Sequence, residues 1–526
     1  MKIVFVSSEV VPFAKTGGLA DVSGALPKVM ASLGNEVTII LPKYKKVDEE
    51  KFELEETDFV FYIPFANKKE KATIKVSKYL ENITTYFVAH PLYFDRDELY
   101  GAASGAYSDN AERFIFFSKA VMELLKQWPA TPAIVSLAAA PGGRADGQAG
   151  CEAPRPLSQE TEQKGRQGQT NKADRNYQPD ILHCHDWQTS LIPVYLKLES
   201  QFSSVKSVYT IHNLAYQGRF TKEVFPLTGL PDELYSIDGL EYYGDVNFMK
   251  GGILFADYVT TVSQRYSKEI LTPEYGCGLE GVLRVRQERL SGILNGIDYN
   301  EWNPATDKFL PTNYTTESVE KKYLVKESLL KESGLPFNEK IPLIGIISRL
   351  ADQKGFDILA ECIDRIFQLN IQMIILGTGE EKYHQLFQSI KERHPQRLTL
   401  VLGFDNALAH RIYAGADFFL MPSLYEPCGL GQMIALKYGT IPIVHATGGL
   451  ADTIQNYSSE MKEGNGFSFA EYSSETLLQA VKMAVKVYEN KEEWLGLIKK
   501  GMREDFSWEV SARKYLELYK ICLKSR

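Results

Sequence analysis

Short apolar runs alternate with longer amphipathic stretches along most of the chain. In the first part the apolar runs are KIVFVSSE, VTIILP, TTYFVAH, DILHCHD, VYTIHN and YVTTVS. Apolar runs of this length between helical patterns are typical of parallel strands that are buried on both faces. The pattern restarts after the turn-rich connector ILNGIDYNEWNP, with PLIGIISRL, MIILGTG, LTLVLGF, FFLMPS and IPIVHATGG. Two successive βα arrays predict an α/β protein with two doubly wound domains.

The connector and the end of the second array set the predicted domain boundaries. We expect a first domain over 1–296 and a second over 297–504. An amphipathic helix over 505–526 follows, and it suits packing on either domain. A chain of 526 residues is longer than one hydrophobic core usually serves, which agrees with this division.

One segment, 129–178, departs from the pattern. It is rich in Ala, Gly, Pro and Gln, and no aromatic residue occurs between Trp128 and Tyr177. Such a composition does not readily form a core, so we expect a disordered surface insertion; a structured regulatory insert is the alternative. The segment precedes the run DILHCHD, which places it at the amino end of that strand. Ligands bind at the opposite sheet edge.

The overall composition and charge indicate which kinds of binding partner and which cellular compartment to expect. The net charge is −8 and 44% of the residues are hydrophobic, so the overall charge favours neither nucleic acid nor an anionic membrane. The six cysteines form no CxxC pair, and no apolar run approaches the roughly 18 residues of a membrane span. Glu9 interrupts the first apolar run, which argues against a signal peptide. We expect a cytoplasmic protein.

The hexapeptide TGGLAD occurs twice, at 16–21 and at 447–452. Both copies stand where a strand gives way to a helix, and paired glycines there let the backbone approach a ligand closely. The first copy follows Lys15, so we expect Gly17 and Gly18 to contact a phosphate beside that cation. The second copy lacks a preceding lysine, and both a tight structural turn and an anion site stay open for it.

A further cationic motif, SRLADQKG, directly follows an apolar run of the second array. It places Arg349 and Lys354 five residues apart. Arginine offers a planar fork of donors and lysine a compact charge, and the two together suit a diphosphate. A solvated loop is the alternative interpretation of this string alone.

Seven motifs in order carry a family resemblance: KTGGLADV, HCHDWQTSLIP, YTIHNLAYQG, LNGID, SRLADQKG, EPCGLGQMIALKYGTIPIV and TGGLADT. The chain resembles the glycosyltransferases that comprise bacterial glycogen synthases and plant starch synthases, over nearly its whole length outside 129–178. The resemblance implies the GT-B fold, two Rossmann-like domains that face a central cleft. It also implies retaining transfer of glucose from ADP-glucose to the nonreducing end of an α-1,4-glucan such as glycogen, with release of ADP and without a metal or cofactor.

The resemblance assigns catalytic roles to six residues: Lys15, Asp186, His212, Arg349, Lys354 and Glu426. The three cations would hold the diphosphate, with Lys15 coming from the domain opposite the other two. Glu426 and His212 would contact the transferred glucose. Asp186 would lie near the reaction centre and the glucan acceptor.

The resemblance assigns further residues to substrate binding: Gly17, Gly18, Asn295, Phe404, Cys428, Gly429, Leu430 and Gly431. Asn295 would hold a sugar hydroxyl, and Phe404 would stack on the nucleobase. The N–H groups of Leu430 and Gly431, at a predicted helix start, would face the leaving phosphate.

Two strings suggest metal sites at first sight. His183 and His185 point to one side of a predicted strand while Cys184 points to the other, and no second ligand cluster follows. Asp95 and Asp97 form a DxD string of the kind that holds a cation in other glycosyltransferases. Because the Arg/Lys pair makes a metal redundant at a diphosphate, we predict no metal site.

Two other functions compete with the transferase. A sugar-nucleotide epimerase on the same fold needs no glucan acceptor. A catalytically silent glucan-binding protein needs no phosphate clamp, and the presence of the cationic set argues against it.

The placement of the insertion yields a first prediction. A chain without 129–178, closed by a short Gly/Ser linker, is expected to transfer glucose at the rate of the full chain, because the segment lies away from the ligand edge. The measurement is kcat/KM of both chains under identical conditions. A large loss of activity in a deletion chain that keeps its far-ultraviolet circular dichroism would contradict the placement.

Overall fold

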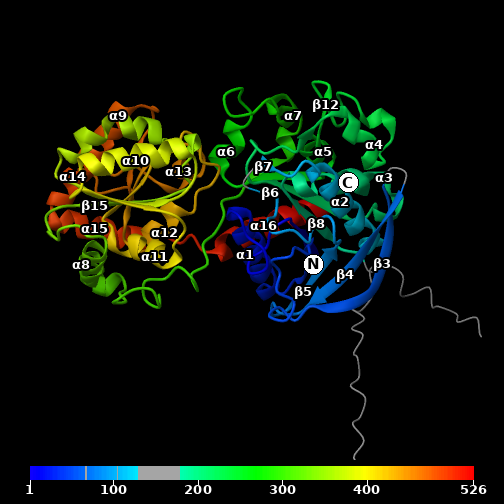
Figure 1. Ribbon diagram of the computed structural model, residues 1–526, viewed down its shortest axis with the longest axis horizontal. Helices are drawn as coiled ribbons and strands as arrows, with labels where there is room; N and C mark the ends of the chain where they lie inside the picture. The colour runs from blue at the N-terminus through cyan, green and yellow to red at the C-terminus, as the bar shows by residue number, and fades with distance from the viewer. Residues whose placement is uncertain (66–67, 103–104, 128–177, 526) are drawn as a thin grey trace, which may run out of the picture.

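The computed structural model describes residues 1–65, 68–102, 105–127 and 178–525. Its two large sheets form two bodies side by side (Figure 1). The first sheet has the order β14-β13-β9-β8-β1-β2-β5-β4-β3. Its strands are β1 (Lys2–Val6), β2 (Glu36–Pro42), β3 (Glu55–Phe65), β4 (Lys68–Ser77), β5 (Ile83–Ala89), β8 (Ile181–His185), β9 (Lys206–Ile211), β13 (Tyr258–Thr261) and β14 (Leu290–Gly292).

The second sheet has six strands in the order β17-β16-β15-β18-β19-β20, and all its pairs are parallel. Its strands are β15 (Leu343–Ile347), β16 (Gln372–Gly377), β17 (Leu398–Leu402), β18 (Phe418–Met421), β19 (Ile441–His445) and β20 (Phe467–Phe469). Numbered along the chain this is the order 3-2-1-4-5-6 of a Rossmann sheet. The predicted pair of doubly wound arrays is confirmed, and every apolar run quoted above forms one of these strands.

The sequence pattern missed the antiparallel edge of the first sheet. Strands β3 and β4 form a hairpin, and β4 pairs antiparallel with β5. Strand β3 ends in the apolar run FVFYIPF, but Pro64 interrupts this run and its alternate residues Val60, Tyr62 and Pro64 are exposed. Strand β4 alternates charged and apolar residues over most of its length. These are features of an edge hairpin with one solvated face and not of the strands buried on both faces on which the prediction rested.

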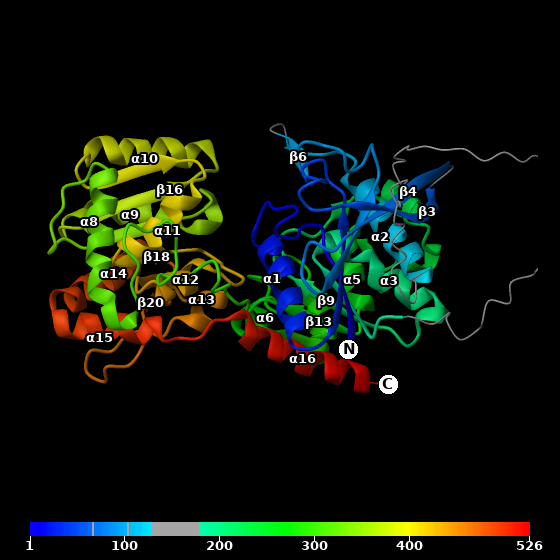
Figure 2. The ribbon, with the colours of Figure 1, turned by 90° about the horizontal axis from the view of Figure 1, so that it is seen from below.

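Helices cover the faces of both sheets (Figures 1 and 2). Those of the first half are α1 (Gly18–Ser32), α2 (Asn110–Lys126), α3 (Leu191–Leu198), α4 (Phe225–Thr228), α5 (Phe248–Phe255), α6 (Gln264–Glu269) and α7 (Glu280–Val285). Those of the second half are α8 (Lys322–Glu332), α9 (Phe356–Phe367), α10 (Glu381–Arg393), α11 (Asn406–Gly415), α12 (Gly431–Lys437), α13 (Gly448–Thr453), α14 (Ser474–Glu489) and α15 (Lys491–Met502). Among the described residues, no helix has the length and apolarity that crossing a membrane requires.

The last helix, α16 (Trp508–Lys524), leaves the second half and runs along the first (Figure 2). Its buried aromatic face, with Trp508, Tyr515 and Tyr519, belongs to the core of the first sheet. The burial of such side chains contributes on the order of 2 kcal/mol each. We propose 1–296, 297–504 and 505–526 as the units of the chain. The segment 129–178 lies outside the described residues except for Gln178.

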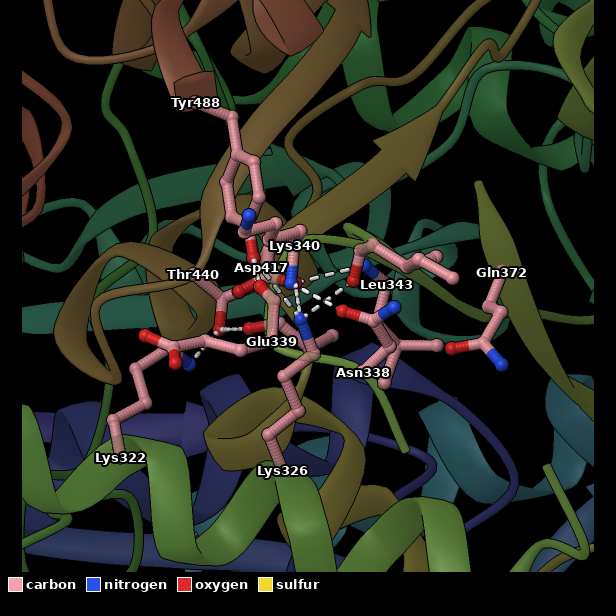
Figure 3. A network of polar contacts seen from close by, with 12 residues as sticks. Lys322, Lys326, Asn338, Glu339, Lys340, Leu343, Gln372, Asp417, Thr440 and Tyr488 are labelled. Carbon is pink, nitrogen blue, oxygen red and sulfur yellow. Dashed lines mark hydrogen bonds and ion pairs between the residues drawn. The ribbon is translucent and has the colours of Figure 1, made fainter. Parts of the chain in front are cut away.

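Two buried lysines anchor α8 to the second sheet (Figure 3). Lys326 Nζ lies 2.6 Å from the carboxylate of Asp417 and also donates to the hydroxyl of Tyr488. Lys322 Nζ donates at 2.6 Å to Thr440 Oγ1 and, at the same distance, to the carbonyl of Ala414. Neither partner of Lys322 is a carboxylate, and burial lowers the pKa of Lys322 to about 7.

This lowered pKa predicts a pH-dependent stability. Between pH 7 and about 10.4 the unfolded chain keeps a proton on Lys322 that the folded chain has released, so the free energy of unfolding rises with pH across this window. Lys322→Met removes the titration. The difference in unfolding free energy, wild type minus variant, is therefore expected to increase between pH 7 and pH 9 in urea titrations.

The control is Lys331→Met, a change of an exposed lysine on the same helix. For this variant, the difference in unfolding free energy from the wild type is expected to stay constant between pH 7 and pH 9. A flat difference for Lys322→Met as well would show that Lys322 stays protonated in the folded protein.

Candidate active site

The order of each sheet reverses at one point, between β1 and β8 in the first sheet and between β15 and β18 in the second. Doubly wound sheets bind ligands at the carboxyl ends of the strands beside such a point. The loops after these four strands carry the motifs KTGGLADV, HCHDW, SRLADQKG and EPCGLG. The fold therefore places four motifs from distant parts of the sequence at the ligand-binding edges of two sheets.

Residues of both halves line one cavity of about 650 Å³. Its walls include eleven predicted site residues: Gly17, Gly18, Asp186, His212, Asn295, Arg349, Lys354, Glu426, Cys428, Gly429 and Leu430. Gly431 lines an adjoining cavity of about 410 Å³. Two predicted site residues, Lys15 and Phe404, line neither of these two cavities.

An ion pair holds the acidic residue of the second half. Lys354 Nζ lies 2.5 Å from Glu426 Oε2, and both side chains are largely buried. Ser423 Oγ donates to the same carboxylate oxygen at 3.2 Å. Gly355 makes the approach possible, because it has φ +72° and a Cβ there would lie 1.9 Å from the carbonyl oxygen of Pro422.

Arg349 reaches across the cavity to the first half. Its guanidinium donates to the hydroxyl of Tyr216 at 3.4 Å. Tyr216 belongs to the motif YTIHNLAYQG but was not among the predicted site residues, because only His212 of that motif was assigned a role. Arg349 and Lys354 thus give the cavity two cations, of which Lys354 is paired with Glu426 and Arg349 meets a neutral partner.

Asp186 stands at the end of β8 in a left-handed backbone conformation, with φ +56°. For a residue with a side chain this conformation costs of order 1–3 kcal/mol, and such strain collects at functional sites. Its Oδ1 accepts the backbone N–H of His212 at 2.8 Å. Burial nevertheless raises the pKa of Asp186 to about 7, so this carboxyl changes charge near neutral pH.

His212 is paired with a second histidine that the sequence did not assign to the site. His185 Nδ1 lies 3.0 Å from His212 Nε2. Burial lowers the pKa of His212 to about 3 and that of His185 well below its ordinary range, so both rings are neutral. From the sequence, His185 is a candidate only for a metal site. Strand pairing of β8 with β9 brings the two rings together, and this pairing is not visible in one motif.

In the first TGGLAD copy, the N–H groups of the turn already donate to a side chain of the protein. The carboxylate of Glu9 accepts the N–H groups of Thr16 and Gly17 at 2.5 and 3.2 Å, and the hydroxyls of Thr16 and Tyr100 at 2.7 Å each. Lys15 instead forms an ion pair with Asp21 at 2.7 Å on the exposed rim. The expected phosphate contact at Lys15 stays a prediction.

Phe404 follows β17 and is 88% exposed. Its ring is available to a flat ligand, and stacking on a nucleobase stays a prediction.

The residues of the two candidate metal strings have other partners. The two ring nitrogens of His183 lie 2.7 Å from the Tyr519 hydroxyl and 2.6 Å from that of Thr210, and Asp97 pairs with Lys45. Within the described part of the chain, no group of three potential ligands gathers to hold a metal.

The chain is similar to known proteins over both halves of this site. The model of the starch synthase catalytic domain matches residues 2–138 and 166–285, and that of glycosyl transferases group 1 matches 330–496. A glycogen synthase from Geotalea daltonii is 45% identical over 530 residues, which cover 100% of both chains. The chain belongs to the glycogen and starch synthase family. It is a glycosyltransferase with the GT-B fold.

Other members of the glycogen and starch synthase family are similar to this chain over its full length. A glycogen synthase from Thermosipho melanesiensis is 44% identical and covers 100% of both chains. The catalytic domain of starch synthase IV from Arabidopsis thaliana, bound to ADP and acarbose, has a TM-score of 0.83 at 33% identity and covers 100% of this chain and 99% of its own. A sucrose-phosphate synthase from Thermosynechococcus elongatus shares the fold, with a TM-score of 0.56 at 15% identity and coverage of 99% and 98%.

The raised pKa of Asp186 yields a prediction for the pH dependence of stability. Because the folded-state pKa of about 7 lies above the ordinary value near 3.9, the folded chain binds more protons than the unfolded chain between these values. The free energy of unfolding of the wild type, relative to Asp186→Asn, is therefore expected to fall as pH rises from 4 to 7. Urea titrations across this range measure it, with the exposed Asp95→Asn as control.

The prediction is contradicted if the unfolding free energy of the wild type, relative to Asp186→Asn, rises with pH or changes only as much as in the control. In either case the pKa of Asp186 in the folded protein would lie below the tested range. Its carboxyl would then be ionised throughout.

Proposed function

We propose that the protein is a glycogen synthase that transfers glucose from ADP-glucose to the nonreducing end of an α-1,4-glucan, with retention of configuration and release of ADP. The observation that carries the proposal is the single cavity in which Arg349, Lys354 and Glu426 of the second half meet Asp186 and His212 of the first. The naming of full-length relatives as glycogen synthases supports it, as does the ADP and acarbose bound to the Arabidopsis neighbour.

The second half supplies the donor site in this proposal. Arg349 and Lys354 bind the diphosphate and stabilise the negative charge that develops as it leaves. Lys354 already holds the Glu426 carboxylate, so an arriving diphosphate shares this cation. Glu426 is thereby fixed beside the glucose, where a carboxylate offsets positive charge on the sugar carbon. Phe404 provides the exposed ring for the base.

The first half supplies the acceptor side. Asp186, with its pKa near 7, contacts the incoming hydroxyl of the glucan, and neutral His212 contacts the transferred glucose. Lys15 adds a third cation when the two halves approach each other, which requires release of its pair with Asp21. The family resemblance implies that the acceptor attacks on the face from which the diphosphate departs, without a covalent intermediate on the enzyme.

The test measures nucleoside diphosphate release and glucan mass gain with ADP-glucose and UDP-glucose in parallel, each with and without glycogen. Primer-dependent release of ADP with matching polymer growth is expected. Lys354→Ala is expected to lower kcat about 100-fold or more, because it removes a cation from the departing charge. Phe404→Ala is expected to act chiefly on the KM for the donor.

Other outcomes select the alternatives. Glycogen binding without diphosphate release from either donor would indicate a silent glucan-binding protein. Conversion of the sugar nucleotide without a glucan primer would indicate an epimerase.

A further inference from the structure

The two halves of the chain touch at a pair of short helices. Helix α6 of the first half and α13 of the second lie side by side in both ribbon views (Figures 1 and 2). The carboxylate of Glu269 in α6 accepts the Gly448 N–H at 3.0 and 3.2 Å and the Thr447 hydroxyl at 3.4 Å. In return, Asp452 in α13 accepts the Arg265 N–H at 3.0 and 3.2 Å. Each helix start is capped by an acidic residue of the other.

The turn that Glu269 caps is the second TGGLAD copy, and this turn is pressed against the loop of Glu426. The N–H of Gly449 donates to the Glu426 carbonyl at 3.1 Å. A Cβ at Gly448 would lie 2.0 Å from that same carbonyl oxygen, and one at Gly449 would lie 2.0 Å from the Cys428 carbonyl oxygen. Side chains are therefore excluded at both positions, and the glycines serve close packing of backbone on backbone.

Glu269 is well suited to hold this turn rigidly. It is 6% exposed, so its hydrogen bonds compete little with water and an unmet carboxylate there would be costly. Arg265 Nε donates to its Oε1 at 2.9 Å and fixes the side chain on its own helix. A continuous set of contacts thus runs from Glu269 through Gly448 and Gly449 to the backbone of Glu426.

We propose that Glu269 is a positioning residue of the active site. Although it belongs to the first half, its carboxylate fixes the turn from Thr447 to Gly449 in the second half, and through this turn the place of Glu426. The donor site is then correctly formed only while α6 and α13 are docked. The catalytic part of this proposal rests on the proposed function; the structural coupling does not.

The two copies of the hexapeptide share this arrangement. In the first copy, Glu9 accepts the N–H groups of Thr16 and Gly17 and the hydroxyl of Thr16. In both copies the TGG turn binds a buried glutamate of the first half, by its backbone N–H and its threonine hydroxyl. One copy is held within its own half, and the other joins the two halves.

The chain offers a matched control for Glu269→Ala. Asp452→Ala removes the opposite cap of the same helix pair and so weakens the same contact between the halves, yet Asp452 makes its cap to α6 and not to the Thr447–Gly449 turn. Glu269→Gln keeps an acceptor oxygen of similar reach and tests partial rescue. Thermal unfolding of all three variants verifies that each is folded at the assay temperature.

The first readout is backbone hydrogen exchange in the absence of substrate. Glu269→Ala is expected to speed exchange at residues 446–450 and also at 424–432, the loop that contains Glu426. Asp452→Ala is expected to speed exchange at 264–269 and to leave 424–432 as in the wild type. Unchanged exchange at 424–432 in Glu269→Ala would overturn the structural coupling, whether or not the protein acts on ADP-glucose.

The second readout is steady-state kinetics with ADP-glucose and glycogen. Glu269→Ala is expected to lower kcat between about 10- and 100-fold, the range of a small misplacement of catalytic groups, with an unchanged KM for glycogen. Glu269→Gln should recover part of the loss, and Asp452→Ala should stay within about threefold of the wild type. Equal losses in Glu269→Ala and Asp452→Ala would overturn the positioning role. A wild-type chain inactive on ADP-glucose would count against the proposed function alone.

Discussion

The division of the site between two separate hydrophobic cores is the constraint on which the rest of the structure depends. Asp186 and His212 are fixed by the first sheet, and Lys354 and Glu426 by the second, so neither half holds a complete set of groups. The chain passes between the halves near residue 297 and again near 507, where Ile297 pairs with Ser507 in a short parallel bridge. Helix α16 then joins the core of the first sheet and ties the end of the chain to its beginning.

Charge is distributed in the cavity so that most of it is already balanced before a ligand arrives. The Lys354–Glu426 pair is largely buried and hydrogen-bonded by Ser423, which orients the carboxylate at little cost in unpaired charge. Within the described part of the chain, the side chain of Arg349 has a tyrosine hydroxyl as its hydrogen-bond partner and no carboxylate, so its charge is available to an anion. Burial, by contrast, holds the two histidines of the first half neutral and moves the titration of Asp186 to neutral pH. The second half thus offers a cation to an anionic ligand, and the first half offers largely neutral groups.

Close backbone packing recurs at three glycines near Lys354 and Glu426. Gly355 admits the carbonyl of Pro422 beside Lys354, and Gly448 and Gly449 admit the carbonyls of Glu426 and Cys428. At each of these positions a methyl group would overlap a backbone oxygen, which neighbouring side chains cannot relieve by rotating. These three glycines therefore do more than permit turns: they set how near the loops of Lys354, Glu426 and Thr447 lie to each other.

The sequence by itself determined eleven of the fifteen strands of the two large sheets, the doubly wound class and eleven of the residues that line the cavity. Buried parallel strands leave continuous apolar runs, and their carboxyl ends collect the polar motifs. It missed the β3–β4 hairpin, which is buried on one face only, and the three-residue edge strands β14 and β20, which are too short to give a pattern. Only the tertiary structure decided the partners. Glu9 and Glu269 fill the two TGG turns and His185 supports His212. These contacts join residues on different elements, up to 179 positions apart, and depend on how strands pair and helices dock. No local pattern of hydrophobic and polar residues encodes such distances, because that pattern records which face of an element is buried and not what it is buried against.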